Sequence, residues 1–305
     1  MHASVLKYFL EVARCGSLHK ASEKMFVAPS AISRQILKLE EEFGTELFDR
    51  LPNGMRLNAA GERLLKHIQM TLQDYQAVRG DIDALKGERT GHIKVAAVDS
   101  AFIDLLPAVV KEFSEAFPAV THTLLAMSAM DVLQQILSGR VDIGVTFVGR
   151  LPAGLVSVCL AGLSPGVVMP PGHPLSQQSE ISLADCAGYP FLAWDNQSQL
   201  TSAMSPEFTK FWNELEPAVT CNCTPMVKQL IAAGRGISFF SKIAFLDEIS
   251  RGEVVWRPFA SPELNRVQVG VVVPSQRKLS AVTQNFISRL ERRLRQMEAI
   301  AASMG

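Results

Sequence analysis

Cysteine and long apolar runs are both scarce in this chain of 305 residues. Its five cysteines are scattered and odd in number, which argues against a disulfide framework and fits a reducing compartment. No segment approaches ~20 consecutive apolar residues, so we expect neither a membrane span nor a secretory signal. These absences predict a cytoplasmic protein that does not work in a membrane.

Catalytic signatures are also sparse. The chain has no His-Glu-x-x-His and no phosphate-loop motif, and its six histidines are dispersed. His173, in a Gly-His-Pro-Leu run just after a predicted strand, is interpreted as a structural turn residue rather than a base. We therefore predict that the chain is not an enzyme and that it holds no cofactor and no metal.

The net charge is zero, yet its distribution favours a polyanionic partner. Residues 1–66 hold ten Lys and Arg against eight Asp and Glu. A local patch of cations can supply the salt-dependent attraction to phosphates that the whole chain lacks. The cations of this predicted patch are Lys20, Arg34, Lys38, Arg50 and Arg56.

The stretch from Ser17 to Ile36 predicts two short helices joined by a tight turn. Ser17 can cap the first helix, and Pro29 fits the first turn of the second, where its missing N–H is not needed. On the second helix, spacings of four and three place Ile32, Ile36 and Leu39 on an inner face. The outer face then carries Pro29, Ser30, Ser33, Arg34 and Lys38. Short hydroxyls and cations suit base edges and phosphates in a major groove of DNA.

A hairpin is predicted after this second helix. Asn53-Gly54 is typical of a two-residue turn, and Arg50 and Arg56 flank it. We interpret the hairpin as a wing whose Asn53 and arginines contact DNA phosphates. The alternative is an ordinary surface hairpin.

These motifs resemble those of the LysR-type transcriptional regulators. Ser33-Arg34-Gln35-Ile36, the run 39–50 and the Ala60-Gly61-Glu62 step follow one another at the family's spacing. Softer matches follow, among them residues 139–144 and 172–175. The resemblance implies an N-terminal winged helix-turn-helix (1–58), a long dimerisation helix (59–87) and a two-lobed α/β effector domain like periplasmic binding proteins (88–305). It also implies double-stranded operator DNA, a small-molecule effector, RNA polymerase and further copies of the chain as partners, in a homodimer or homotetramer.

Residues 59–86 predict a single helix ~40 Å long, because they contain no proline and keep an apolar stripe at steps of three and four. We predict that this stripe pairs with a second chain. The alternative is a helix packed along its own effector domain. The predicted dimerisation residues are Leu65, Ile68, Leu72, Tyr75, Val78 and Ile82.

From residue 92 onward strands and helices alternate, which favours parallel sheets with right-handed crossovers. We assign lobe 1 to about 92–163 and 267–300, and lobe 2 to about 164–266. Ligands of such folds lie at the carboxyl ends of strands, between the lobes. Ser100, Ser128 and Thr224 each follow a strand there, and Phe147 and Trp194 can form apolar walls. We predict that these five residues bind the effector, with an anion such as a carboxylate held at helix N-termini. The alternative for each hydroxyl is simple helix capping.

Two further functions stay open. Cys221 and Cys223 are interpreted as small core residues, but they also allow a thiol-based redox sensor. An unchanged peroxide response of a Cys221→Ser variant would eliminate that reading. A ligand-independent DNA-organising protein is the other alternative, and its DNA footprint would ignore every metabolite.

Overall fold

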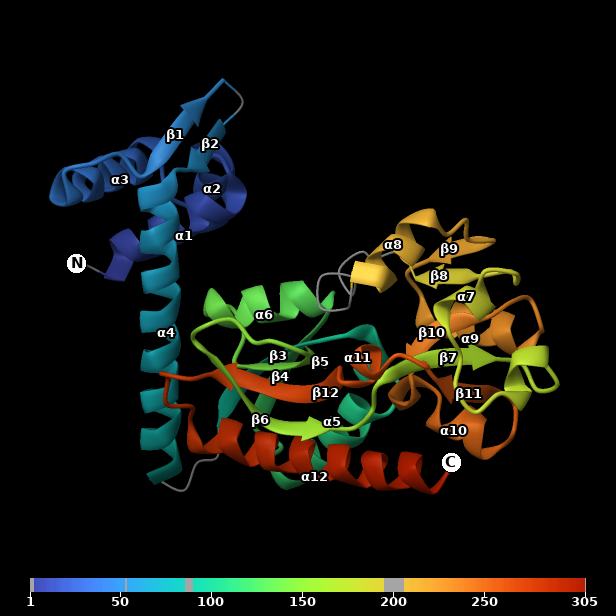
Figure 1. Cartoon of the computed structure of the whole chain (residues 1–305). Helices are drawn as coiled ribbons and strands as arrows, with labels where there is room; N and C mark the ends of the chain where they lie inside the picture. The colour runs from blue at the N-terminus through green and yellow to red at the C-terminus, as the bar shows by residue number, and fades with distance from the viewer. Residues whose placement is uncertain (1–2, 53, 86–89, 195–205, 305) are drawn as a thin grey trace. The chain divides into compact units, whose positions relative to one another are not determined.

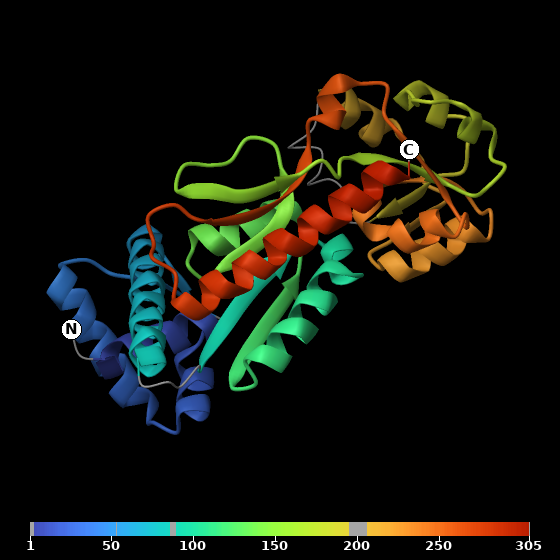
Figure 2. The same ribbon diagram turned by 90° about the horizontal axis from the view of Figure 1, so that it is seen from below.

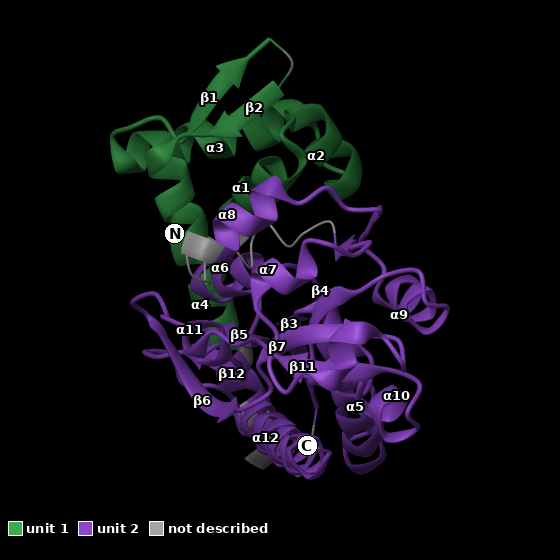
Figure 3. Ribbon diagram, turned by 45° about the vertical axis from the view of Figure 1, so that its right-hand side comes forward, with its two compact units in different colours: residues 1–75 green, residues 76–305 purple. Residues whose placement is uncertain are grey.

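The computed structural model describes residues 3–52, 54–85, 90–194 and 206–304. The chain forms two compact units, residues 1–75 and 76–305 (Figure 3). The boundary between them falls inside one continuous helix, α4 (Ala59–Leu85). No helix in the described ranges combines the length and apolarity needed to cross a bilayer. The predicted three-part division at residues 58 and 87 stays a prediction.

The first unit consists of a helix-turn-helix, a hairpin and the start of α4 (Figure 1). As the sequence predicts, Ser17 caps α2, where its Oγ accepts the N–H of Lys20 at 3.4 Å, and Pro29 opens α3. Buried side chains from α1, α3, β1 and α4 share one core, which includes Phe9, Ile36 and Phe48. The remaining bounds are α1 (Ala3–Cys15), α2 (Leu18–Met25), α3 (Pro29–Phe43), β1 (Phe48–Leu51) and β2 (Gly54–Leu57).

Two polar side chains hold the hairpin against its neighbours. Glu40 on α3 is buried, and its carboxylate accepts the N–H of Leu47 at 2.8 Å. Asn58 accepts the N–H groups of Ala60 at 3.0 Å and Gly61 at 2.9 Å, which caps α4. The Asn58 amide also donates to the Glu46 carbonyl at 2.8 Å. Glu46 and Leu47, the residues just before β1, are therefore hydrogen-bonded to side chains at the end of α3 and at the start of α4.

The predicted Asn53-Gly54 turn is wrong. Leu51 pairs with Gly54, so Gly54 is the first residue of β2 rather than half of the turn, and Asn53 lies outside the described residues. Gly54 has a φ of +146°, and a Cβ there would lie 2.3 Å from the Gly16 carbonyl oxygen. That same carbonyl accepts the N–H of Met55 at 2.8 Å. Glycine is needed at this position for close backbone approach, not for turn formation.

The second unit contains lobe 1, built on a five-stranded sheet of order β4-β3-β5-β12-β6. Helices α5 and α12 cover one face of this sheet, and α6 covers the other (Figures 1 and 2). Strand β3 is parallel to β4 and β5, as predicted, but β12 is antiparallel to both β5 and β6. The bounds are β3 (Gly91–Ala97), α5 (Leu105–Ala116), β4 (Val120–Ala126), α6 (Ala129–Leu137), β5 (Ile143–Val148), β6 (Leu155–Ala161), β12 (Gln268–Pro274) and α12 (Ala281–Ser303).

Lobe 2 departs further from the predicted parallel arrangement. Its three-stranded sheet, β10-β7-β11, is antiparallel. Strands β8 and β9 run parallel, and isolated parallel bridges join Phe191 to Ile237 and Ile181 to Phe259. In lobe 1 the antiparallel strand is β12, because it returns from lobe 2 and enters the sheet at the end where β3 and β5 finish. The bounds are β7 (Pro165–Met169), α7 (Leu183–Cys186), β8 (Leu192–Trp194), α8 (Pro206–Glu214), β9 (Val219–Cys221), α9 (Thr224–Ala232), β10 (Ser238–Ser241), α10 (Leu246–Ser250), β11 (Val255–Pro258) and α11 (Pro262–Asn265).

A pair of glycine variants in α4 tests the contact between this helix and the hairpin. A Cβ on Gly61 would lie 2.1 Å from the Leu47 carbonyl oxygen, whereas one on Gly80 would meet nothing closer than 4.0 Å. We expect Gly61→Ala to lower stability by about 1–3 kcal/mol through overpacking. Gly80→Ala should raise it by roughly 0.5–1 kcal/mol through helix propensity. Thermal unfolding followed by circular dichroism measures both, and an unchanged Tm in Gly61→Ala contradicts the close approach.

Candidate functional site

The outer face of α3 is available for binding. Ile32, Ile36 and Leu39 are buried, so the predicted inner face is confirmed. On the opposite side Pro29, Ser30, Arg34 and Lys38 are exposed and Ser33 is half-buried, while Lys20 is exposed on α2. The Arg34 side chain makes only a long contact, 3.4 Å from its Nε to the Ser30 carbonyl. Its guanidinium can therefore turn toward a ligand without breaking a strong bond.

Arg50 and Arg56 are exposed on β1 and β2. The Arg56 guanidinium lies 3.3 Å from the Asp49 carboxylate, in an ion pair that is exposed on both sides. Such an ion pair contributes little to stability, so Arg56 can leave Asp49 and pair with a phosphate at little cost.

The apolar stripe of α4 divides into two parts. Leu65 and Ile68 are buried in the core of residues 1–75, so these two side chains stabilise the chain's own fold. Leu72, Tyr75, Val78 and Ile82 are exposed, at 39–65%. Of the six residues predicted to pair with a second chain, these four are therefore free to do so, whereas Leu65 and Ile68 are buried within their own chain.

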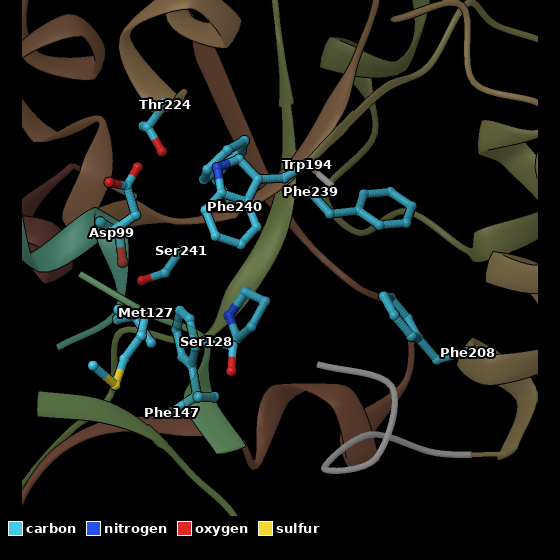
Figure 4. Close-up of a pocket in the computed structure, with 14 residues that line it drawn as sticks. Asp99, Met127, Ser128, Phe147, Trp194, Phe208, Thr224, Phe239, Phe240 and Ser241 are labelled. Carbon is cyan, nitrogen blue, oxygen red and sulfur yellow. The ribbon is translucent and has the colours of Figure 1, made fainter. Parts of the chain in front are cut away.

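A cavity lies where the two lobes meet, and all five residues predicted to bind the effector line it (Figure 4). Its volume is about 60 Å³. Ser100 and Ser128 follow β3 and β4 in lobe 1, and Thr224 follows β9 in lobe 2. Phe147 and Trp194 come from the ends of β5 and β8. The rule that ligands bind at the carboxyl ends of strands thus brings together residues up to 124 positions apart in sequence (100 to 224).

Several polar atoms of this cavity have no hydrogen-bond partner among the described residues. They are Asp99 Oδ2, Ser100 Oγ, Trp194 Nε1 and Thr224 Oγ1, two from each lobe. Ser100 and Thr224 are 5% and 0% exposed, so bulk water does not compensate them. Each unsatisfied buried group costs about 1–3 kcal/mol. Such a cluster indicates a site built to receive hydrogen bonds from something else.

Ser128 is different, because it caps its own helix. Its Oγ accepts the N–H of Asp131 at 3.1 Å and donates to the Asp131 carboxylate at 2.6 Å. The alternative of simple capping therefore describes Ser128, whereas Ser100 and Thr224 make no such bond in the described part of the chain.

Sequence reasoning missed further residues of the cavity. Asp99 directly precedes Ser100, and Phe240 and Ser241 end β10, so the same rule about strand ends points to all three. Phe208 and Phe239 also line the wall. No sequence signal distinguishes these two from ordinary core aromatics.

The two segments that cross between the lobes are tied to each other and to α12. The Ser164 hydroxyl on the first crossing donates to the Asn265 carbonyl on the second at 2.7 Å. Glu298 on α12 accepts the N–H of Gly162, and this bond holds the pKa of its carboxyl below the usual value. Burial lowers the pKa of Lys242, whose ammonium lies 4.6 Å from the centre of the Trp256 ring and donates to Ala301.

The sequence contains a Gly-x-Ser-x-Gly run at residues 162–166, a spacing that in some hydrolases marks a catalytic serine. It connects β6 to β7 rather than a strand to a helix, and its Ser164 is bonded to a backbone carbonyl. A nucleophile elbow requires a strand–turn–helix with an exposed serine, so this match is structural. His173 also has a structural place, because its Nδ1 accepts the N–H of Leu175 at 3.3 Å and its ring packs against Tyr189.

The interpretation as core residues is wrong for Cys223, whereas Cys221 packs at the edge of a core cluster in lobe 2. Cys221 is half-buried at the end of β9, and Cys223 is exposed at the start of α9. The chain leaves the strand between them, so the predicted one-sided strand spacing does not apply. The thiol-sensing alternative stays a prediction.

An exposed reading helix with a wing, followed by a two-lobed α/β domain with a central cavity, defines a DNA-binding regulator with a ligand-binding half. Residues 4–62 match the family described as bacterial regulatory helix-turn-helix protein, lysR family. Residues 86–295 match the LysR substrate binding domain. The chain belongs to the LysR family of transcriptional regulators, which are not enzymes.

Curated relatives cover most of the chain. It is 27% identical over 279 residues to a probable nitrogen assimilation transcriptional activator of Synechococcus elongatus, covering 90% of each protein. It is 29% identical to the regulator AlsR of Bacillus subtilis, covering 85% of this chain and 86% of that protein.

Solved structures share the fold. A full-length OxyR variant from Pseudomonas aeruginosa matches with a TM-score of 0.65 and 19% identity, covering 97% of this chain and 95% of that one. Full-length CbnR in complex with its target DNA matches with a TM-score of 0.57 and 17% identity, covering 97% and 100%.

Two buried threonines test whether the cavity hydroxyls are unsatisfied. Thr224 and Thr146 are both 0% exposed, but only Thr146 donates a bond, to the Ala129 carbonyl at 3.4 Å. We expect Thr224→Val to leave Tm unchanged or raise it, and Thr146→Val to lower stability by about 1 kcal/mol. Thermal unfolding of both ligand-free variants decides this. Equal destabilisation would mean that Thr224 already has a partner.

Proposed function

We propose that α3 enters the major groove of operator DNA and reads base edges with Ser30, Ser33 and Arg34. Pro29, Lys20 and Lys38 contact or approach the backbone, and Arg50, Asn53 and Arg56 contact phosphates beside the wing. The observation that carries this proposal is the face of α3 that is exposed and polar opposite its three buried aliphatic residues.

The second half of the proposal is control by a small molecule bound between the lobes. The support is the cavity with its four unpartnered polar atoms. To regulate, the molecule must bind two arrangements of the protein with different affinity, by about 1–3 kcal/mol. Ser100, Ser128, Phe147, Trp194 and Thr224 are its proposed contacts.

We also infer that the chain works as a homodimer or homotetramer in the cytoplasm, where its operators and RNA polymerase lie. Leu72, Tyr75, Val78 and Ile82 support a paired helix, because exposed apolar side chains in one stripe favour association. Paired DNA-binding heads then require half-sites spaced by whole turns of DNA.

Selection of genomic DNA fragments by the purified protein at moderate salt, with a polyanionic competitor, tests the DNA-binding proposal first. We expect a dyad-symmetric site. With that site, Arg34→Ala should weaken specific binding by about 1–3 kcal/mol and relax one base preference. Arg14→Ala removes an equal charge that Glu11 already pairs at 2.7 Å, and it should change affinity much less. Normal operator affinity in Arg34→Ala would refute the assignment of α3 as the reading helix.

Paired substitutions on α4 test the oligomer. The double variant Tyr75→Gln with Val78→Gln removes two exposed apolar side chains, whereas Arg79→Gln changes an exposed polar neighbour. We expect the double variant to shift sedimentation toward the monomer and Arg79→Gln to leave it unchanged. An unchanged oligomer in both variants would place the pairing surface elsewhere.

A further inference from the structure

Among the described residues that line the cavity between the lobes, one side chain is charged, and its charge is negative. Asp99 is the single acidic residue that lines it, and no Lys, Arg or His is among the described lining residues. Asp99 makes no ion pair among the described residues, and its Oδ2 is buried without a partner. In Figure 4 its carboxylate is turned toward the Thr224 hydroxyl of the opposite lobe. A bound anion would face this carboxylate with no cation to offset the repulsion.

Part of the attraction for an anion at both helix N-termini is already used. The first turn of α6 holds the Asp131 carboxylate, bonded to Ser128 at 2.6 Å, which offsets the positive end of that helix. At α9, Pro225 has no N–H, and the N–H groups of Met226 and Val227 donate to the Cys223 carbonyl at 3.0 and 3.2 Å. Capture of a carboxylate at these helix starts is therefore weakened, because fewer of their N–H groups remain free to donate.

The walls suit a positive charge attached to an apolar body. Phe147, Trp194 and Phe240 line the cavity together with Met127. Aromatic faces attract organic cations, and tryptophan does so most strongly. A metal ion is disfavoured, because no three His, Cys, Asp or Glu side chains group together in the described parts of the chain.

We infer that the effector of this regulator is a small organic ammonium ion with an apolar or aromatic body, its charged nitrogen donating to Asp99. This inference rests on the proposed control by a small molecule. The Ser100 and Thr224 hydroxyls can accept the remaining N–H groups of the ammonium or bond to polar groups of its body. The aromatic side chains then enclose the apolar part.

Three probes of similar size but different charge test this inference on the full chain. At neutral pH benzylamine is a cation, benzyl alcohol is neutral and benzoate is an anion. Binding is followed by thermal shift and by the fluorescence of Trp194 in the cavity wall. The wild-type protein should prefer benzylamine over benzyl alcohol, and benzoate should bind most weakly.

Two matched variants locate the preference. Asp99→Asn removes the charge at constant shape and should weaken benzylamine binding about tenfold or more, the scale of losses at desolvated charge pairs. Its affinity for benzyl alcohol should hardly change. Asp247→Asn makes the same substitution on an exposed carboxylate of α10 and should keep the full benzylamine preference.

The opposite results overturn the inference. A wild-type protein with no preference for benzylamine over benzyl alcohol, or with a preference for benzoate, refutes an ammonium effector. So does an Asp99→Asn variant that keeps the benzylamine preference. Operator binding measured on the same proteins separates the two proposals. Intact DNA binding without the cation preference refutes only the ligand class, and loss of DNA selection with the preference intact refutes only the regulator proposal.

Discussion

The fold of the second unit depends on β12, a strand near the end of the chain that completes the sheet of lobe 1. Strands β5 and β6 do not pair with each other, and β12 lies between them with hydrogen bonds to both. Without β12 the sheet of lobe 1 would leave two unpaired edges inside the protein, where unbonded N–H and C=O groups are unfavourable. Its valines at 269 and 271–273 are buried, and a Cβ on Gly270 would lie 2.7 Å from Val148 and 2.8 Å from Leu160. The chain must therefore leave lobe 1 after β6 and return as β12, which fixes two crossings and the cavity beside them.

The cavity between the lobes is lined by polar atoms that lack hydrogen-bond partners among the described residues. Four polar atoms from three strand ends find no partner in the described parts of the chain: Asp99 Oδ2, Ser100 Oγ, Trp194 Nε1 and Thr224 Oγ1. Buried hydroxyls away from the cavity are bonded, because Ser238 donates to Leu192 at 2.6 Å and Thr146 to Ala129 at 3.4 Å. The grouping of four unpartnered atoms around one cavity is what supports a role in ligand binding.

Periodicity and strand-end logic predict much of this structure, and chain path explains most of what they miss. Local geometry decides the inner face of α3, the cap at Ser17, the start of α3 at Pro29 and the grouping of the five cavity residues, so the sequence predicts them. The antiparallel β12 and the β10-β7-β11 sheet do not, because strand direction depends on which lobe the chain comes from. Gly54 and the exposed Cys223 show a second limit of prediction from sequence. The close backbone contact at Gly54 and the point where the strand before Cys223 ends are both set by tertiary structure, which local patterns do not reveal. The rule that ligands bind at the carboxyl ends of strands selects Ser100, and it applies equally to Asp99, the residue before it.

The coupling of ligand to DNA binding is constrained by how the crossings are built. Ser164 and Asn265 join the two crossings directly, and Gly162 ties the first crossing to Glu298 of α12. Lys242, which follows β10 in lobe 2, bonds to Ala301 of the same helix. A ligand that contacts Asp99 in lobe 1 and Trp194 in lobe 2 changes the free energy of bringing the lobes together. Because the two crossings are bonded to each other, we expect the lobes to rotate about both crossings together. Separation of the lobes at a single crossing would break the bond between Ser164 and Asn265. We expect any resulting change to reach α12, because this helix packs on the sheet beside β6 and β12 and is bonded to the first crossing.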